Sequence, residues 1–250
     1  MKNYKLVIAY DGLPFHGWQV QENAQSIQSL IQNALSLIFR QPIKIVGSGR
    51  TDSGVHALGQ TAHFQTDASF KYYKVLGSLN GLLPPEIRIL SLEEVPDTFH
   101  AQYSAIGKIY RYHIVLDPIL SPFKRGRVWH ISYPLDLEAM FQASRRLLGT
   151  HDFTSFANEA HEGTAAKDPV RTIHRIDFIK NEGELALEFE GDGFLYKMVR
   201  NMVGTLMEVA AGKRKPEEID AILEKRDRRA AGVSAPPQGL FLVKVLYALH

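Results

Sequence analysis

One carboxylate stands in a glycine-rich segment, "GSGRTDSGVHALGQ", which covers residues 47–60. The acid is Asp52; the cation Arg50 lies two positions before it, and the small residues Ser53 and Gly54 follow it. A nearby cation favours the ionised form of a carboxylate. Small neighbours let a backbone approach a ligand closely. The segment therefore presents an acid whose surroundings suit chemistry, and the rest of the sequence must show which chemistry.

The glycines of this segment do not form a known nucleotide-binding pattern. Gly47, Gly49 and Gly54 miss the dinucleotide spacing G-x-G-x-x-G, because the third glycine comes two residues late. The phosphate-binding P-loop is also absent, since no Gly-Lys-Ser/Thr follows. A loop that cradles a nucleotide phosphate is not expected here.

Three other interpretations of Asp52 can be considered from the residues alone, and the residues argue against the first two. An aspartic protease needs two carboxylates that share a proton, and the chain has no second Asp-Ser/Thr-Gly. Metal-dependent hydrolysis is disfavoured because the ten histidines are scattered, and single ones such as His56 and His63 are more often structural than ligands. The plainest interpretation is a turn residue whose carboxylate bonds nearby backbone N–H groups.

Composition indicates a globular protein with a real core. The chain has 250 residues, 45% of them hydrophobic and 22% charged, and contains no cysteine. Disulfides and thiolate metal sites are therefore excluded, which fits a cytoplasmic location. The N-terminus lacks the apolar run of a signal peptide, and no stretch approaches the ~20 apolar residues of a membrane span.

The formal net charge of +2 hides local clusters of positive charge. "KRGR" at 124–127, "GKRK" at 212–215 and "KRDRR" at 225–229 are basic runs, whereas acidic residues gather elsewhere. Such runs suit a polyanion such as nucleic acid, although solvated surface faces have the same composition.

Hydrophobic periodicity predicts the order β-α-β-β-α-β in the first half. Alternation predicts strands, and apolar residues at helical spacing predict helices. The strands are expected in "YKLVIAY", "IKIVG", "QTAHFQT" and "IRILSLEEV", and the helices in "SIQSLIQNALSLIF" and "ASFKYYKVLGSLNGLL". This order is that of the ferredoxin-like fold.

The second half, from residue 104, repeats this order with additions. Its expected strands are "KIYRYHIVL", "TIHRIDFIK", "ELALEFEG" and "LFLVKVLYAL"; its expected helices are "LDLEAMFQASRRLL", "FLYKMVRNMVGTLMEVAAG" and "PEEIDAILEKRD". We therefore expect an α+β fold with an N-terminal half at 1–103 and a C-terminal half at 104–250. The two ferredoxin-like halves are expected to join into one broad, mainly antiparallel sheet, with helices on one side and an RNA-binding cleft on the other.

Five blocks, in order along nearly the whole chain, resemble the tRNA pseudouridine synthase A family. They are "YDGLPFHGWQVQ", "GRTDSGVHALGQTAHF", "FHAQYSAIGKIYRYHI", "GTHDFTSFAN" and "FLYKMVRNMVGTLMEVAAGK". The family commonly has tyrosine where this chain has Phe15, and alanine where it has Ser53. The second substitution is small and leaves the acid and the arginine in place.

The resemblance implies a site and a substrate. Asp52 matches the family's catalytic aspartate, and Tyr110 matches the tyrosine that lies against the target base. Arg50 and Arg200 match arginines of the active site. The family isomerises uridines 38, 39 and 40 in the anticodon stem-loop of tRNA, as a homodimer that needs neither cofactor nor metal.

The chemistry of pseudouridine formation suits these residues. The bond from ribose C1′ to uracil N1 breaks and the base rejoins through C5, so the formula is unchanged and no cosubstrate is required. An ionised Asp52 can attack C1′ or first take a ribose proton, and the sequence leaves both routes open. Tyr110 offers a ring for the extracted base. Tyr112 shares its strand face, so that only the resemblance selects Tyr110.

Arg200 lies on a mostly apolar helix, expected from Phe194 to Ala211, with Tyr196, Val203 and Met207 on the same stripe. An arginine there needs an anionic partner, for which Asp52 is the candidate, or extends its charge to solvent. A non-catalytic RNA-binding module built on ferredoxin-like units is the alternative function.

Overall fold

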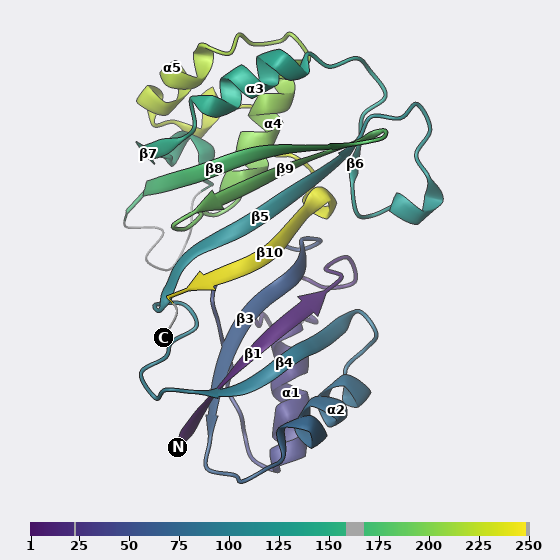
Figure 1. Cartoon of the computed structure of the whole chain (residues 1–250), viewed down its shortest axis with the longest axis vertical. Coiled ribbons are helices and arrows are strands. Elements are labelled where there is room, and N and C mark those ends of the chain that lie inside the picture. The colour runs from purple at the N-terminus through teal and green to yellow at the C-terminus, as the bar shows by residue number, and fades with distance from the viewer. Residues whose placement is uncertain (23, 159–167, 249–250) are drawn as a thin grey trace. The chain divides into compact units, whose positions relative to one another are not determined.

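The computed structural model describes residues 1–22, 24–158 and 168–248 (Figure 1). The chain divides into two compact units. The first contains Met1–Ile106 and the C-terminal segment from Phe241, and the second contains Gly107–Leu240. The expected division after residue 103 falls close to this boundary, whereas the last strand, expected in the second half, groups with the first unit.

The first unit is a sheet with two helices. Strand β1 pairs antiparallel with both β3 and β4. The short β2 pairs antiparallel with β3, and β10 runs parallel to β3. The elements are β1 (Lys2–Tyr10), α1 (Ile27–Phe39), β2 (Val46–Gly47), β3 (His56–Thr66), α2 (Tyr72–Leu82), β4 (Ile87–Val95) and β10 (Leu240–Tyr247). Up to β4 this is the expected β-α-β-β-α-β order.

Strand β2 is shorter than the sequence indicates, because side chains of α1 take over the backbone bonds of Ile45. The Gln32 side chain accepts from the Ile45 N–H at 3.1 Å, and Gln28 donates to the Ile45 carbonyl at 3.0 Å. With its N–H and carbonyl thus satisfied, Ile45 needs no partner strand. Helix α1 itself begins after Ser26, whose hydroxyl accepts from the Ser29 N–H in a capping box.

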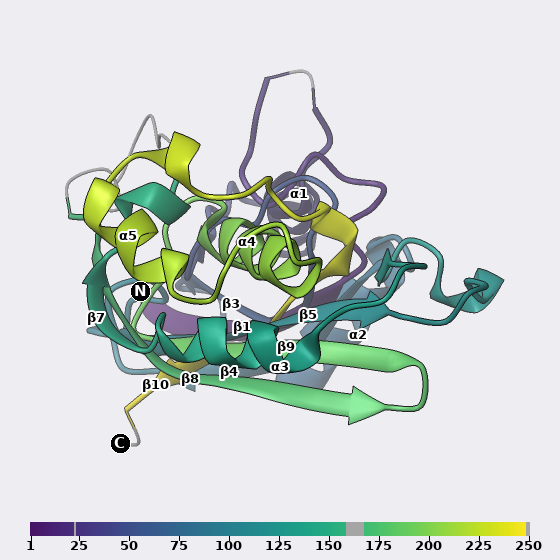
Figure 2. The same ribbon diagram turned by 90° about the horizontal axis from the view of Figure 1, so that it is seen from above.

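The second unit also combines a mainly antiparallel sheet with helices. Strand β5 pairs with β9, β9 with β8, and β8 with β7, all antiparallel; the short β6 runs parallel to β5. The elements are β5 (Ala105–Val115), β6 (Trp129–His130), α3 (Leu137–Arg145), β7 (Gly149–Asp152), β8 (Val170–Asn181), β9 (Glu184–Gly191), α4 (Met198–Ala210) and α5 (Glu218–Lys225). Seen from above, the long loop between β5 and β6 projects beyond these strands (Figure 2). The expected α+β class with mainly antiparallel strands is confirmed.

Helix α4 begins four residues later than the sequence predicts. Lys197, its N-cap residue, has φ +59°, a left-handed conformation that interrupts helical geometry. The Tyr196 carbonyl accepts from the Asn158 N–H at 3.0 Å instead of from a helical partner. The expected helical stripe is therefore wrong at Tyr196, which precedes the helix, but holds for Arg200, Val203 and Met207.

Candidate active site

Asp52 opens a tight turn between β2 and β3. The Val55 N–H donates to the Asp52 carbonyl at 3.1 Å, and Gly54, the third residue of the turn, has φ +78°. A positive φ at this position is adopted readily only by glycine. The glycine that follows the acid in the sequence is thus required by the turn. The turn interpretation and the catalytic one are compatible, because the backbone forms the turn and leaves a partly exposed carboxylate in it.

The N-terminal block of the sequence holds this turn from one side. The Trp18 N–H donates to the Thr51 carbonyl at 3.1 Å, and the Tyr10 hydroxyl lies 2.8 Å from the Thr51 hydroxyl. Burial raises the pKa of Tyr10, so its hydroxyl keeps its proton at neutral pH. The Ser53 hydroxyl donates to the Phe15 carbonyl at 3.1 Å. The residues on both sides of Asp52 are therefore fixed by the "YDGLPFHGW" segment.

His56 anchors the end of the loop in the core. Its ring is 1% exposed and stacks on Phe241 with centroids 4.5 Å apart. Its Nδ1 atom accepts from the Gly12 N–H at 3.1 Å and lies 3.2 Å from an Asp11 carboxylate oxygen. The Gly12 bond requires a lone pair on Nδ1, so the ring proton is assigned to Nε2. With this tautomer the contact to Asp11 is not an ion pair. His56 is structural here, as the sequence indicates.

Arg50 and Asp52 lie in the same loop. The Gln60 amide donates to the Gly49 carbonyl at 3.1 Å, and its oxygen accepts from the Ser48 hydroxyl at 2.7 Å. These bonds fix the backbone just before Arg50, whose side chain is exposed. The loop thus carries the cation Arg50 and the acid Asp52 on a backbone that hydrogen bonds hold in place.

In the second unit, Tyr110 and Tyr112 face the same side of β5 but have different surroundings. Tyr112 is fully buried, and its hydroxyl donates to the Pro236 carbonyl at 2.7 Å. A Cβ on Gly239 would come within 2.6 Å of its ring, so the packing is tight. Tyr110 is 8% exposed and meets Phe194 edge-on at 5.2 Å. Tyr112 is therefore a core residue. Its hydroxyl bond distinguishes it from Tyr110, which sequence spacing alone could not do.

Arg200 extends from α4 toward the segment around Ala235. Its Nε donates to the Ala235 carbonyl at 2.8 Å, and the Ala235 N–H donates to the Arg200 carbonyl at 3.0 Å. The side chain is partly buried, and its charge acts on the neighbouring Tyr112. Because the Nε edge of the guanidinium donates to a neutral carbonyl, the side chain is positioned without loss of its charge.

Two further residues near Tyr110 escaped the sequence reasoning. Lys108 lies two positions before Tyr110 and so shares its face of β5. Burial lowers the pKa of Lys108 to about 8, and the positive charge of Arg171 acts in the same direction. Phe194 packs on Tyr110. The sequence signal that could have identified Lys108 is its position in "KIYRY", two residues before Tyr110. Phe194 was missed because the sequence analysis placed it in the helix that in fact begins at Met198.

Comparison with known proteins gives a consistent result. The family model described as "tRNA pseudouridine synthase" matches residues 6–104 and 143–248. The chain is 55% identical to "tRNA pseudouridine synthase A 1" of Protochlamydia amoebophila, covering 99% of this chain and 97% of that protein. It is 47% identical to "tRNA pseudouridine synthase A" of Exiguobacterium sp., covering 99% and 98%.

The chain belongs to the tRNA pseudouridine synthase family. Enzymes of this family are isomerases that convert uridine to pseudouridine. Among solved structures, a chain of a Cbf5–Nop10–Gar1 complex superposes with a TM-score of 0.38 at 10% identity, covering 95% of this chain and 57% of that one.

The basic run at 212–215 divides into paired and unpaired cations, which matters for a family that handles tRNA. Arg214 is bonded through Nε to Glu208 at 2.6 Å. Lys213 and Lys215 are exposed, and neither forms an ion pair with any other residue that the structure describes. The two lysines are thus the members of this run whose charge is available to a polyanion.

The run at 225–229 is mostly engaged within the protein. Arg226 pairs with Asp152 at 3.1 Å, and Arg229 pairs with Asp227 at 2.7 Å. Arg228 donates to the Asn201 side chain at 3.0 Å. This family member therefore uses much of the run for internal structure.

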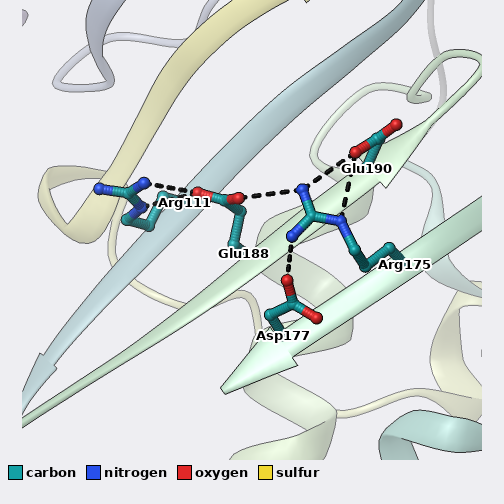
Figure 3. A network of polar contacts seen from close by, with 5 residues as sticks. All are labelled: Arg111, Arg175, Asp177, Glu188 and Glu190. Carbon is teal, nitrogen blue, oxygen red and sulfur yellow. Dashed lines mark hydrogen bonds and ion pairs between the residues drawn. The ribbon is translucent and has the colours of Figure 1, made fainter. Parts of the chain in front are cut away.

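Two arginines on the strands of the second unit, Arg111 and Arg175, also form ion pairs within the protein (Figure 3). Arg111 donates to Glu188 at 2.6 Å; Arg175 binds Glu188 at 3.1 Å, Glu190 at 2.9 Å and also Asp177. Burial opposes ionisation of Glu188, but the bonds from both arginines outweigh it and hold its pKa below the usual range. Two cations meet three acids here, so the charges of both arginines are already balanced within the protein.

Two kinds of feature are absent from the described residues. No three histidine or acidic residues among 1–22, 24–158 and 168–248 are grouped so that they would hold a metal ion. Within the same ranges, no helix has both the length and the apolar character of a membrane span.

Proposed function

We propose that this chain isomerises uridine to pseudouridine in the anticodon stem-loop of tRNA, at positions 38, 39 and 40. Its membership of the family supports the reaction. The observation that carries the proposal is the turn at Asp52, in which bonds to Thr51, Ser53 and His56 hold a partly exposed carboxylate beside small residues. A turn held in this way suits a carboxylate that must approach a ribose.

Asp52 is the proposed catalytic nucleophile. The C1′–N1 bond of the uridine breaks, the freed uracil turns, and C5 bonds to C1′; the C5 proton leaves and N1 is protonated. A carboxylate can attack C1′, or it can take a ribose proton first, and either route leaves the formula of the nucleotide unchanged. One acid is sufficient because uracil is both the leaving group and the returning nucleophile.

Tyr110 is proposed to stack on the extracted base and to help remove the C5 proton. Stacking of a base on an aromatic ring contributes roughly 1–3 kcal/mol. The engagement of the Tyr112 hydroxyl with Pro236 supports the choice of Tyr110 over its neighbour.

The two arginines complete the proposed site. Arg50 takes a phosphate or fills the space that the base leaves in the stem. Arg200 keeps the Asp52 carboxylate ionised and orients it toward the target uridine. The pairing of Arg200 with Asp52 rests on the sequence pattern and the resemblance. A double-mutant cycle with Asp52→Asn and Arg200→Met tests it, because coupled partners give non-additive free energies of unfolding and independent residues give additive ones.

The proposed partners are tRNA and a second copy of the chain, in the cytoplasm, with neither cofactor nor metal. A non-catalytic RNA-binding module is the competing function; the basic runs suit both functions, but only catalysis accounts for an acid and an arginine two residues apart in a glycine-rich loop. Tritium release from tRNA labelled at uracil C5 separates the two, since binding alone releases none. Three transcripts with a single labelled uridine at 38, 39 or 40 should each release tritium. Tight binding without release would contradict the proposal.

A further inference from the structure

A polar pocket lies between three segments of the second unit. Its volume is about 730 Å³, and pockets that hold small ligands measure roughly 300–1,000 Å³. The walls come from the turn after β7, from the residue two positions before α4 and from the chain that leaves α5. The polar residues that line it are Thr154, Asn158, Tyr196, Arg226, Asp227 and Arg228. This size and polarity suit a ligand as large as one nucleotide.

The pocket is bonded to the first turn of α4, which carries Arg200. The Asn158 N–H donates to the Tyr196 carbonyl at 3.0 Å, and the Asn201 side chain donates to the Asn158 side-chain oxygen at 3.0 Å. Arg228 in turn donates to the Asn201 oxygen at 3.0 Å. Asn201 is fully buried and directly follows Arg200. A ligand in the pocket would therefore lie beside the part of the helix that is proposed to hold the target uridine.

Arg228 is a partly buried cation whose hydrogen-bond partners are neutral. Among the described residues it donates to the side chains of Asn201 and Ser234 and to a backbone carbonyl. Its Nε atom is buried and has no partner within the same ranges. Burial lowers the pKa of Arg228, against a smaller opposite effect of Glu208, a carboxylate already paired with Arg214. Because an anion offsets the cost of burying a cation, Arg228 favours a negatively charged ligand.

The other charges that line the pocket do not supply that anion. Arg226 pairs with Asp152 at 3.1 Å, and Asp227 pairs with Arg229 at 2.7 Å. Two acids thus meet two arginines, which leaves the charge of Arg228 in excess. The phosphate groups of nucleic acids are anions that such an excess attracts.

Tyr196 and Asn158 suit the base of a nucleotide. The Tyr196 side chain is 43% exposed, and the Lys197 ammonium lies 5.1 Å from the centre of its ring. Because the Asn158 oxygen accepts from Asn201, the Asn158 NH₂ group is left to donate. An aromatic ring stacks on any base. An NH₂ donor, by contrast, selects a base with a carbonyl oxygen, which uracil, cytosine and guanine have and adenine lacks.

We propose that this pocket binds a second nucleotide of the substrate RNA, one that neighbours the target uridine. Its base stacks on Tyr196 and its phosphate lies at Arg226 and Arg228. The Asn158 NH₂ group donates to a carbonyl of that base, so that adenine fits least well. The inference rests on the proposed function, because it takes the substrate to be RNA. A free mononucleotide offers the same chemistry, and the tests below separate the two sources.

Abasic scanning of the RNA tests the stacking contact. Anticodon stem-loops with one abasic nucleotide at each position near the target uridine are measured by filter binding. At one position, loss of the base should weaken binding to the wild type by about 5–100-fold and leave binding to Tyr196→Leu unchanged. Tyr196→Phe keeps the ring and should respond as the wild type does. The proposal is wrong if no position distinguishes the wild type from Tyr196→Leu.

Asn158→Asp tests which base the pocket selects. The variant keeps an oxygen that accepts from Asn201 and replaces the NH₂ donors with an acceptor. At the position found by the abasic scan, the wild type should bind uracil more tightly than adenine. The variant should reverse this order, because adenine offers an amino group. The same preference in both proteins would contradict the proposed contact.

Arg226→Gln tests the phosphate contact. It should reduce the slope of log affinity against log salt by about one. Lys225→Gln is the matched control, since it removes an exposed charge of the same basic run from outside the pocket and should keep the slope. Equal slopes for the two variants would overturn the proposal.

Titration with uridine 5′-monophosphate, followed by calorimetry, tests for a free nucleotide. Binding that depends on Tyr196, together with an abasic scan that shows no effect, would assign the pocket to free nucleotides and overturn the proposal. All of these measurements report affinity. Tritium release by the wild type therefore reports separately on the proposed reaction, and either result can fail without the other.

Discussion

Gly17 lies directly against the backbone of Asp52. A Cβ on Gly17 would stand 2.7 Å from the Thr51 carbonyl oxygen and 3.2 Å from the Asp52 carbonyl carbon. Gly17 also has φ +83°, which side chains rarely adopt. The glycine of the N-terminal block therefore sets how closely that block packs under the proposed catalytic acid.

Gly17→Ala should destabilise the fold by about 1–3 kcal/mol and lower turnover, because the methyl group must push the Asp52 turn aside. Urea unfolding and tritium release measure the two effects. Gly77→Ala is the matched control: Gly77 is inside α2 with open space around it, and alanine there should stabilise by about 0.5–1 kcal/mol. Equal stabilities for the two variants would show that the contact at Gly17 does not constrain the loop.

Tyr110→Phe and Tyr112→Phe should separate chemistry from packing. Loss of the Tyr110 hydroxyl should lower turnover by about 10²–10⁴-fold with tRNA binding retained, if that hydroxyl handles the C5 proton. Loss of the Tyr112 hydroxyl should cost about 1 kcal/mol of stability, since it removes the bond to Pro236, and leave turnover near normal. Single-turnover tritium release and urea melts check both. Near-normal turnover in Tyr110→Phe would restrict Tyr110 to stacking.

Much of this fold was predictable from local pattern. The alternation in β1, the helical spacing and Ser26 cap of α1, and the apolar face of α4 all specify the element that forms. The errors are accompanied by contacts from outside the segment concerned. Side chains of α1 replace a partner strand at Ile45, and the Asn158 N–H binds the Tyr196 carbonyl just before the left-handed Lys197, after which α4 begins.

The candidate site was predictable only in part. Residue types and spacing singled out Asp52 and Arg50, whereas only the resemblance selected Tyr110 over Tyr112; the bond that engages the Tyr112 hydroxyl comes from Pro236, far along the chain. The burial of Lys108 depends on strands that pair with β5, so no local pattern reveals it.

Lys213→Gln with Lys215→Gln should weaken tRNA binding and flatten its salt dependence. Each phosphate contact that is lost reduces the slope of log affinity against log salt by about one. Arg214 is left intact because its charge already balances Glu208, which accepts from the Val233 N–H at 3.1 Å. Filter binding across a salt series is the measurement. An unchanged slope would place both lysines away from bound RNA.

Lys108 should make stability rise with pH. Its pKa is about 8 in the folded chain and has its ordinary value of 10.5 when unfolded. Between these values the unfolded state binds more protons, so the free energy of unfolding increases as pH rises from 8 toward 10.5. Below pH 8 the cost of burying the charge is fully present. The gain should be on the order of 1–3 kcal/mol.

Lys108→Met should remove this gain. Urea unfolding of wild type and variant at several pH values between 7 and 10 isolates it, because other titrating groups cancel in the difference. A difference that does not change with pH would contradict the lowered pKa.

The central claim is that the Asp52 carboxylate performs the chemistry. Asp52→Asn is nearly isosteric and retains the turn, because the Val55 N–H bonds the backbone carbonyl of residue 52. Asp97→Asn, at an exposed position outside the proposed site, is the control for a lost charge. The decisive measurement is tritium release from C5-labelled tRNA by the two variants at saturating enzyme. We predict that Asp52→Asn binds tRNA as the wild type does but loses turnover by about 10³-fold or more, while Asp97→Asn is unaffected. Wild-type release by Asp52→Asn would contradict the account.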